Sequence, residues 1–141
     1  MSTVFADTGA WIALLSRDDR QHAPTVHRYR QLLEQGDRLL TNNYVVAETA
    51  THLRYHLGLA AAVDFRSMLQ AAVANGRVRV AWVDERTEDD GWQVLQQYAA
   101  VGLSLTDAVS AVMARAGRIV EVFGCDHDFE ALGFTVLPGY R

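Results

Sequence analysis

The chain has 141 residues, of which 50% are hydrophobic and 21% charged, and its 13 basic and 17 acidic side chains give a net charge of −4. This composition excludes an intrinsically disordered chain, and the length predicts a single domain over residues 1–141. No apolar stretch approaches the ~20 residues of a membrane span, and the N-terminus lacks the basic region of a signal peptide. A cytoplasmic protein without membrane attachment is expected.

The cysteine and arginine content limits the kinds of metal site and nucleic-acid contact that the chain can form. Cys125 is the only cysteine, so it cannot form a disulfide framework or a thiolate zinc site, and any metal would need oxygen or histidine ligands. All 13 basic residues are arginine, which pairs well with phosphate. Genome-wide codon bias explains this preference better than a nucleic-acid surface does. The acidic total also argues against tight binding along a duplex.

Short apolar runs alternate with longer segments of helical periodicity, which favours a parallel sheet with helices on both faces. In chain order we expect a strand over 3–6, helices over 10–16 and 24–36, a strand over 39–41, and helices over 44–56 and 59–74. These elements are followed by a strand over 77–83 and by helices over 87–100 and from 104–107 to about 115. The last expected elements are a strand over 119–123, a helix over 128–132 and a strand over 135–137.

Four acidic residues stand where predicted elements begin or end. Asp7 follows the first strand, and Glu48 lies one turn into the helix after the second strand. Asp107 opens a helix, and Asp126 follows the fourth strand. Because ligands bind outside the carboxyl ends of parallel strands, the four carboxylates are expected to converge there if the strand order allows it. Clustered carboxylates repel one another unless a cation lies between them, and Mg²⁺ or Mn²⁺ at such a site suits phosphodiester hydrolysis.

Ordinary structural roles account for each of these residues taken singly. Asp7 and Asp107 could cap helices, Asp126 could stabilise a turn, and Glu48 could be a solvated helix residue. The functional interpretation therefore depends on their joint placement.

Four segments, in this order, resemble the motifs of the PIN domain family, and in particular its VapC toxin ribonucleases. They are Asp7-Thr8-Gly9-Ala10, Thr41-Asn42-Asn43-Tyr44-Val45-Val46-Ala47-Glu48-Thr49, Leu103-Ser104-Leu105-Thr106-Asp107-Ala108-Val109-Ser110, and Asp126-His127-Asp128-Phe129 before Leu132-Gly133-Phe134. Each motif alone is weak, but the ordered set is specific and extends over almost the whole chain.

The resemblance implies an α/β fold, a three-layer α/β/α sandwich with a central parallel sheet, and Mg²⁺- or Mn²⁺-dependent cleavage of single-stranded RNA. It makes Asp7, Glu48, Asp107 and Asp126 the catalytic and metal-binding residues. Side chains that could support them by hydrogen bonds are Thr8, Asn43, Ser104, Thr106 and Asp128. The resemblance further implies a toxin restrained by a small antitoxin protein, and a homodimer. The apolar stretches 45–50 and 57–63 could supply the groove for the antitoxin.

The chain departs from the family at the fourth motif. Family members often carry Thr or Ser two residues before the last aspartate and His two residues after it, whereas this chain has Gly124 and Asp128. Two alternatives to a toxin follow. The chain could be an RNA-processing PIN nuclease outside a toxin–antitoxin pair, or a PIN-fold binding protein that has lost catalysis.

Two further patterns have competing interpretations. Glu48, His52 and His56 recur every four residues on one helix face, which suggests zinc, but Glu48 and His56 would lie ~12 Å apart along the helix axis, too far for one ion. The three tryptophans could stack on bases, although we expect them to pack in the core. They are Trp11, Trp82 and Trp92.

Overall fold

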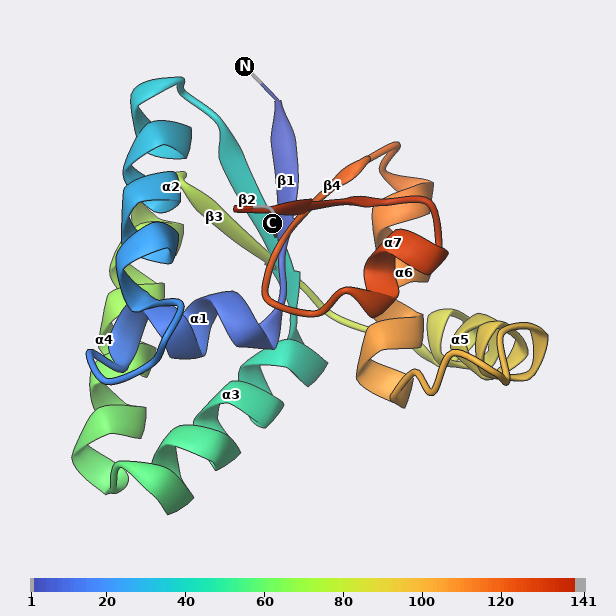
Figure 1. Cartoon of the computed structure of the whole chain (residues 1–141), viewed down its shortest axis with the longest axis horizontal. Helices are drawn as coiled ribbons and strands as arrows, with labels where there is room; N and C mark the ends of the chain where they lie inside the picture. Colours follow the sequence, from blue (N-terminus) through green and yellow to red (C-terminus); the bar gives the residue numbers. More distant parts are fainter. Residues whose placement is uncertain (1, 139–141) are drawn as a thin grey trace.

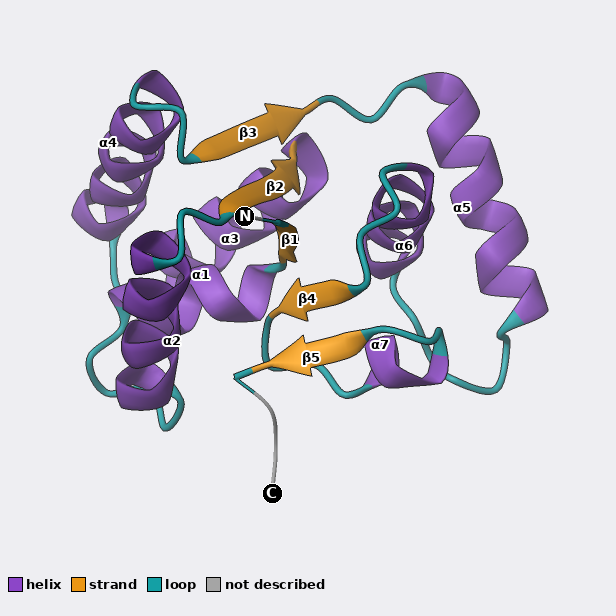
Figure 2. Cartoon of the chain, turned by 90° about the horizontal axis from the view of Figure 1, so that it is seen from above, coloured by secondary structure: helices purple, strands orange, loops and turns teal. Residues whose placement is uncertain are grey.

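The computed structural model of the protein describes residues 2–138 and has a sheet of five parallel strands at its centre (Figures 1 and 2). The spatial order is β3-β2-β1-β4-β5, so the first strand in the chain is the central one. The strands are β1 (Thr3–Ala6), β2 (Arg38–Asn42), β3 (Val78–Ala81), β4 (Glu121–Phe123) and β5 (Thr135–Leu137).

Helices cover both faces of this sheet (Figures 1 and 2). One layer contains α1 (Thr8–Leu15), α2 (His22–Glu34), α3 (Asn43–His56) and α4 (Leu59–Ala74), with α3 packed against α1 and α4. The other contains α5 (Glu85–Gln97), α6 (Leu105–Ala116) and α7 (Asp128–Ala131). The predicted three-layer α/β/α sandwich with a central parallel sheet is confirmed. Within residues 2–138, each helix is too short or too polar to cross a membrane.

The central strand is apolar throughout because helices cover it on both sides. Val4, Phe5 and Ala6 are fully buried, and Trp11 at the start of α1 is buried against Phe65 of α4, with ring centroids 6.1 Å apart. The Trp11–Phe65 contact packs α1 against α4, and this packing also positions Asp7, the residue that joins β1 to α1.

Trp82 and Trp92 do not pack in the core, so that expectation is wrong for both. They are 77% and 51% exposed. Trp82 lies just beyond β3, which ends earlier than predicted because the next segment turns away and its Val83 N–H donates to Asn43 Oδ1 (2.7 Å). Trp92 lies on α5, whose buried residues are Gly91 and Val94.

The strand order creates a crevice beside β1. The chain runs from β1 outward through β2 to β3, and later returns to the opposite side of β1 at β4. In open α/β sheets, ligand crevices form at such a reversal, outside the carboxyl ends of the strands. Asp7 lies there, and its backbone N–H donates to the carbonyl of Phe123 at the end of β4 (2.9 Å). The loop after β4 is thereby held beside Asp7.

We expect Gly91→Ala to destabilise the protein, although alanine ordinarily favours a helix interior by ~1 kcal/mol over glycine. A Cβ at Gly91 would lie 2.6 Å from Val109 Cγ1 and 3.3 Å from the Val109 backbone nitrogen, so α5 would be forced away from α6. Overpacking of this kind costs about 1–3 kcal/mol, and urea denaturation should show a net loss in the free energy of unfolding. In a Val109→Ala background the same change should be neutral or stabilising. A gain in stability in the unaltered background would contradict this account of the α5–α6 contact.

Candidate active site

Four acidic side chains from separate parts of the chain line one cavity of about 460 Å³ at the carboxyl edge of the sheet: Asp7, Glu48, Asp107 and Asp126. The cavity lies between the end of β1, the middle of α3, the first turn of α6 and the loop after β4. Its remaining lining residues are Thr8, Gly9, Ile12, His52, Ser104 and Cys125. The fold thus brings together the four acidic residues that were expected to converge because of their positions near the ends of strands.

Asp7 is the most deeply buried of the four, with 4% of its surface exposed. It is the N-cap residue of α1, yet its side chain makes no capping hydrogen bond, and Oδ1 is buried without a hydrogen-bond partner. Burial and the charge of Asp107 raise the pKa of Asp7 from 3.8 to about 8; the charges of Glu48 and Asp126 add to this, while the Thr8 backbone N–H acts against it. A helix-capping role therefore does not account for this carboxyl group.

Asp107 is oriented by a reciprocal capping box at the start of α6. Its backbone N–H donates to Ser104 Oγ (3.0 Å), and the Ser104 backbone N–H donates to Asp107 Oδ2 (3.0 Å). Oδ2 of Asp107 thus takes part in capping α6, as the sequence analysis allowed for this residue. Oδ1 takes no part in the capping box. Burial raises the pKa of Asp107, the Ser104 hydrogen bonds lower it, and the charges of Asp126 and Glu48 raise it further.

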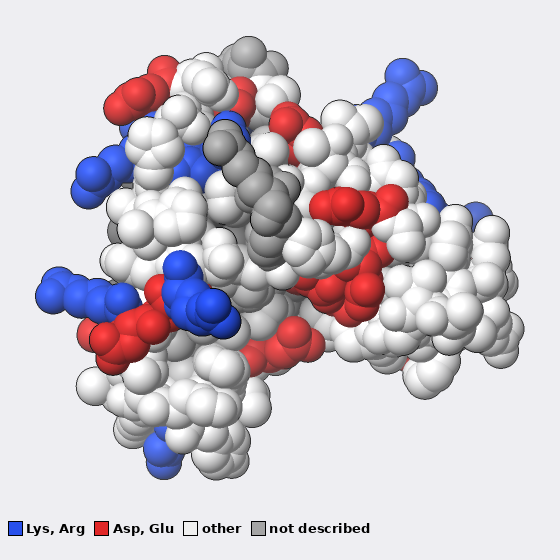
Figure 3. All heavy atoms as spheres, viewed as in Figure 1, with Lys and Arg blue, Asp and Glu red and all other residues white. Residues whose placement is uncertain are grey.

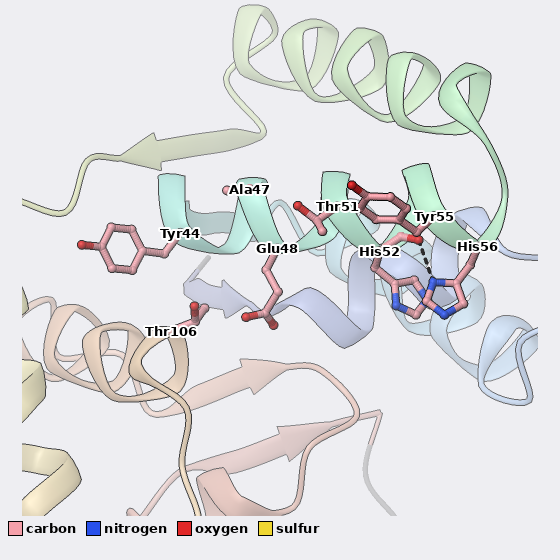
Figure 4. A pocket seen from close by; sticks show the side chains of 8 residues that line it. All are labelled: Tyr44, Ala47, Glu48, Thr51, His52, Tyr55, His56 and Thr106. Atoms are coloured by element: carbon pink, nitrogen blue, oxygen red, sulfur yellow. Dashed lines mark hydrogen bonds between the residues drawn. The ribbon is translucent and has the colours of Figure 1, made fainter.

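Glu48 and Asp126 are less enclosed. Glu48 is exposed and extends from α3 into the space between α3 and the start of α6, where Thr106 lies (Figure 4). Asp126 is partly buried, and its Oδ1 accepts the backbone N–H of Asp128 (2.9 Å), so it also stabilises the turn before α7. Asp126 therefore combines a structural role with a position in the cavity wall.

Asn42 connects the two helices that carry Glu48 and Asp107, a role that the sequence did not reveal. Its buried side chain caps α3 by accepting the Val45 N–H (2.8 Å), and its Nδ2 donates to Ser110 Oγ of α6 (3.1 Å). The capping position was predictable from Asn at a helix start. The contact to Ser110, 68 residues later, has no local sequence signal.

The residues expected to support the carboxylates divide into three groups. Thr8 and Ser104 line the cavity. Thr106 lines a neighbouring cavity along α3. Asn43 and Asp128 lie outside the cavity lining; Asn43 instead accepts a backbone N–H from the segment after β3.

Gly124 lies directly against Asp7. A Cβ at this position would be 3.3 Å from Asp7 Cβ and 3.8 Å from Asp7 Oδ2, which is tight but not excluded. The family's Thr or Ser hydroxyl would therefore stand beside this carboxyl group. In this chain glycine leaves that side of Asp7 without a hydroxyl donor.

The donor chemistry fits a hard divalent cation. Four carboxylates surround one cavity, a buried Asp7 oxygen has no partner, and each of the two buried aspartates has a raised pKa. In Figure 3 the largest group of acidic side chains lies near the middle of the face, with no basic side chain visible within it. Within the described part of the chain no three His, Cys, Asp or Glu side chains are close enough to hold one ion, so cation binding would require the carboxylates to move inward.

Asp7 should make stability depend on pH. Its raised pKa means that the folded protein binds this proton more tightly than the unfolded chain, so protonation favours the fold. In EDTA the free energy of unfolding should therefore fall as pH rises from about 4 to about 8, the interval between the two pKa values. Asp7→Asn should flatten this slope and raise stability at neutral pH, measured by denaturant unfolding. The matched control is exposed Asp64→Asn, and equal effects of the two substitutions would contradict the assignment.

Known proteins resemble the chain over nearly its full length. Residues 4–135 match the PIN domain family. The 23S rRNA-specific endonuclease VapC20 of Mycobacterium tuberculosis is 30% identical over 132 residues, which cover 94% of this chain and 95% of that protein. Its crystal structure, described as that of a Sarcin-Ricin loop cleaving toxin, superposes with a TM-score of 0.79 and covers 94% of this chain and 96% of that chain.

A more distant structure shares the fold. VapBC2 from Rickettsia felis, solved bound to a promoter DNA fragment, superposes with a TM-score of 0.67 at 12% identity, and the match covers 96% of this chain and 97% of that chain. The sequence match, the strand order and the placement of the acidic residues agree with one another. The chain belongs to the PIN domain family.

Proposed function

We propose that the protein is a metal-dependent endoribonuclease that cleaves single-stranded regions of RNA and acts as the toxin of a toxin–antitoxin pair. The observation that carries the proposal is the convergence of Asp7, Glu48, Asp107 and Asp126 on one cavity, with a buried Asp7 oxygen that has no partner. Similarity to an endonuclease that acts on 23S rRNA supports RNA as the substrate class. We further propose that residues 1–141 form one domain that acts in the cytoplasm.

Asp7 and Asp107 are the residues that we propose to hold the cation, Mg²⁺ or Mn²⁺, with Glu48 and Asp126 completing the set. The bound cation would activate water and neutralise the charge that develops on the phosphate. The capping box engages Oδ2 of Asp107 and leaves Oδ1 to bind the cation. Glu48, the most accessible of these carboxylates, would accept a proton from the attacking water once the cation is bound.

Cleavage should depend on all four carboxylates, and least on Asp126. We expect Asp7→Asn and Asp107→Asn to reduce cleavage by at least ~100-fold, because each removes a charge that would hold the cation. Glu48→Gln should also cause a large loss. Asp126→Asn should cost less than Asp7→Asn, because one Asp126 oxygen is engaged by the Asp128 N–H. The measurement is the initial rate of RNA cleavage with added Mg²⁺ or Mn²⁺.

The control for this series is exposed Asp64→Asn, which should leave the rate unchanged. Far-ultraviolet circular dichroism of each variant would separate loss of the site from loss of the fold. Wild-type cleavage that continues undiminished in EDTA would refute the metal-dependent mechanism.

An antitoxin would have two features to recognise. The carboxylate cavity is a natural receptor for an inserted arginine or lysine, which would replace the charge of the cation and block RNA. Near the α3–α4 junction, Leu57, Leu59 and Val63 are 48%, 59% and 51% exposed and offer apolar surface to an amphipathic segment. The 45–50 stretch contributes less than expected because Val45 and Thr49 are buried in the protein's own core. A homodimer stays a prediction from the family.

Induced expression of the chain should stop growth of the host culture, and Asp107→Asn should remove that effect. The small protein encoded beside its gene should restore growth and co-purify with the toxin, and Leu59→Asp should weaken co-purification by placing a charge on the apolar surface. Light scattering of the purified protein would test the homodimer. Growth arrest that persists with Asp107→Asn would contradict a toxin that acts by cleavage.

A further inference from the structure

A second cavity, of about 600 Å³, runs along α3 beside the carboxylate cavity (Figure 4). Glu48 and His52 line both cavities, so the two lie side by side at these side chains. Its volume lies within the roughly 300–1,000 Å³ of pockets that hold small organic ligands. A ligand that reaches the carboxylates along α3 must therefore pass over this second cavity.

Several residues that line this cavity carry flat rings, among them His52, Tyr55 and His56. The rings of His52 and His56 are stacked, with centroids 4.0 Å apart and planes 16° from parallel. A carbonyl oxygen can only accept, so Nδ1 of His56 carries a proton and donates to the His52 carbonyl (2.9 Å; dashed in Figure 4), which fixes the orientation of the second ring. Tyr55, which precedes His56 in α3 and also lines the cavity, is 81% exposed. The two imidazole rings are thus held in place, and the Tyr55 ring beside them is free to stack on another planar group.

The histidine pair does not form a metal site with Glu48. Glu48 and His56 are separated by two helical turns, and within residues 2–138 no three His, Cys, Asp or Glu side chains are close enough to hold one ion. The regular spacing that suggested zinc in the sequence therefore needs another explanation. The two stacked histidine rings, which follow Glu48 along α3, provide that explanation if they bind another planar group.

The lining also argues against phosphate as the group bound in this second cavity. It contains no arginine, and its one charged side chain is the acidic Glu48. An anion would be repelled there, whereas a nucleobase is neutral, flat and able to form hydrogen bonds with nearby hydroxyls. Thr51 and Thr106 supply such hydroxyls in the lining.

We propose that this α3 cavity is a stacking subsite for a nucleobase of the RNA strand, next to the phosphate that is cleaved. His52, His56 and Tyr55 provide the stacking surface. The inference rests on the proposed ribonuclease function and adds how a neighbouring nucleotide is held. Aromatic stacking on single-stranded RNA is sequence-tolerant and worth roughly a 5- to 150-fold change in affinity per base.

RNA is favoured over a protein partner because the cavity adjoins the carboxylate site, with Glu48 and His52 lining both, and because its lining is rich in flat rings. The apolar surface suited to a protein segment lies farther along the chain, at Leu57, Leu59 and Val63. These three residues do not line the α3 cavity.

The test uses the full chain and a single-stranded oligoribonucleotide selected for cleavage from a randomised pool, with Mn²⁺ added. Tyr55→Ala and His56→Ala should each raise KM roughly 5- to 150-fold, with a much smaller change in kcat, and Tyr55→Phe should restore KM because the ring is retained. The matched control is Trp82→Ala, which removes an exposed ring that lines neither cavity and should leave KM unchanged.

A second arm replaces single bases of the RNA by abasic sites. At one position beside the cleaved bond, loss of the base should raise KM more for the wild type than for Tyr55→Ala, because that variant already lacks part of the same contact. Unchanged KM in Tyr55→Ala and His56→Ala, in an enzyme that does cleave, would overturn the subsite. The same result accompanied by a change in oligomeric state would assign the rings to a protein interface instead. A wild type that cleaves no RNA would overturn the proposed function itself.

Discussion

The carboxyl group of Asp7 is held inside the protein by the backbone on both sides of it. The residue ends the central strand, its N–H is bound to the carbonyl of Phe123, and α1 begins at the next residue and is anchored by the buried ring of Trp11. The side chain therefore cannot turn to solvent, and it faces Asp107 in a poorly solvated cavity. A proton or a cation must neutralise this group. The three other carboxylates that line the cavity supply further ligands for a cation.

Two helical layers meet at this point, one carrying Glu48 and the other carrying Asp107. The hydrogen bond from Asn42 to Ser110 joins them, so the carboxylates on α3 and α6 keep a defined relation although they belong to opposite layers. The same helix that brings Glu48 to the cavity continues outward with His52 and His56. We therefore propose that α3 serves both the proposed cleavage chemistry and the placement of the RNA strand.

Periodicity and strand ends predicted much of this arrangement. Apolar runs marked all five strands, and the helix starts could be predicted from local chemistry, as at Asn42 and Ser104, whose side chains accept backbone N–H groups three residues on. Three-dimensional contacts could not be predicted in the same way. The exposure of Trp82 depends on where the chain leaves β3, and Asn43 lies outside the cavity lining because its side chain accepts the N–H of Val83, 40 residues later.

Cation binding at Asp7 can be measured by calorimetric titration of the protein with Mn²⁺ at pH 7, in two buffers of different ionisation enthalpy. A carboxyl group with a pKa of about 8 is largely protonated at this pH, so a cation that binds there must displace the proton. We expect binding with release of about one proton per protein, and both binding and release should be strongly reduced in Asp7→Asn. Binding that releases no proton and is unaffected by this substitution would show that the cation is not held at Asp7.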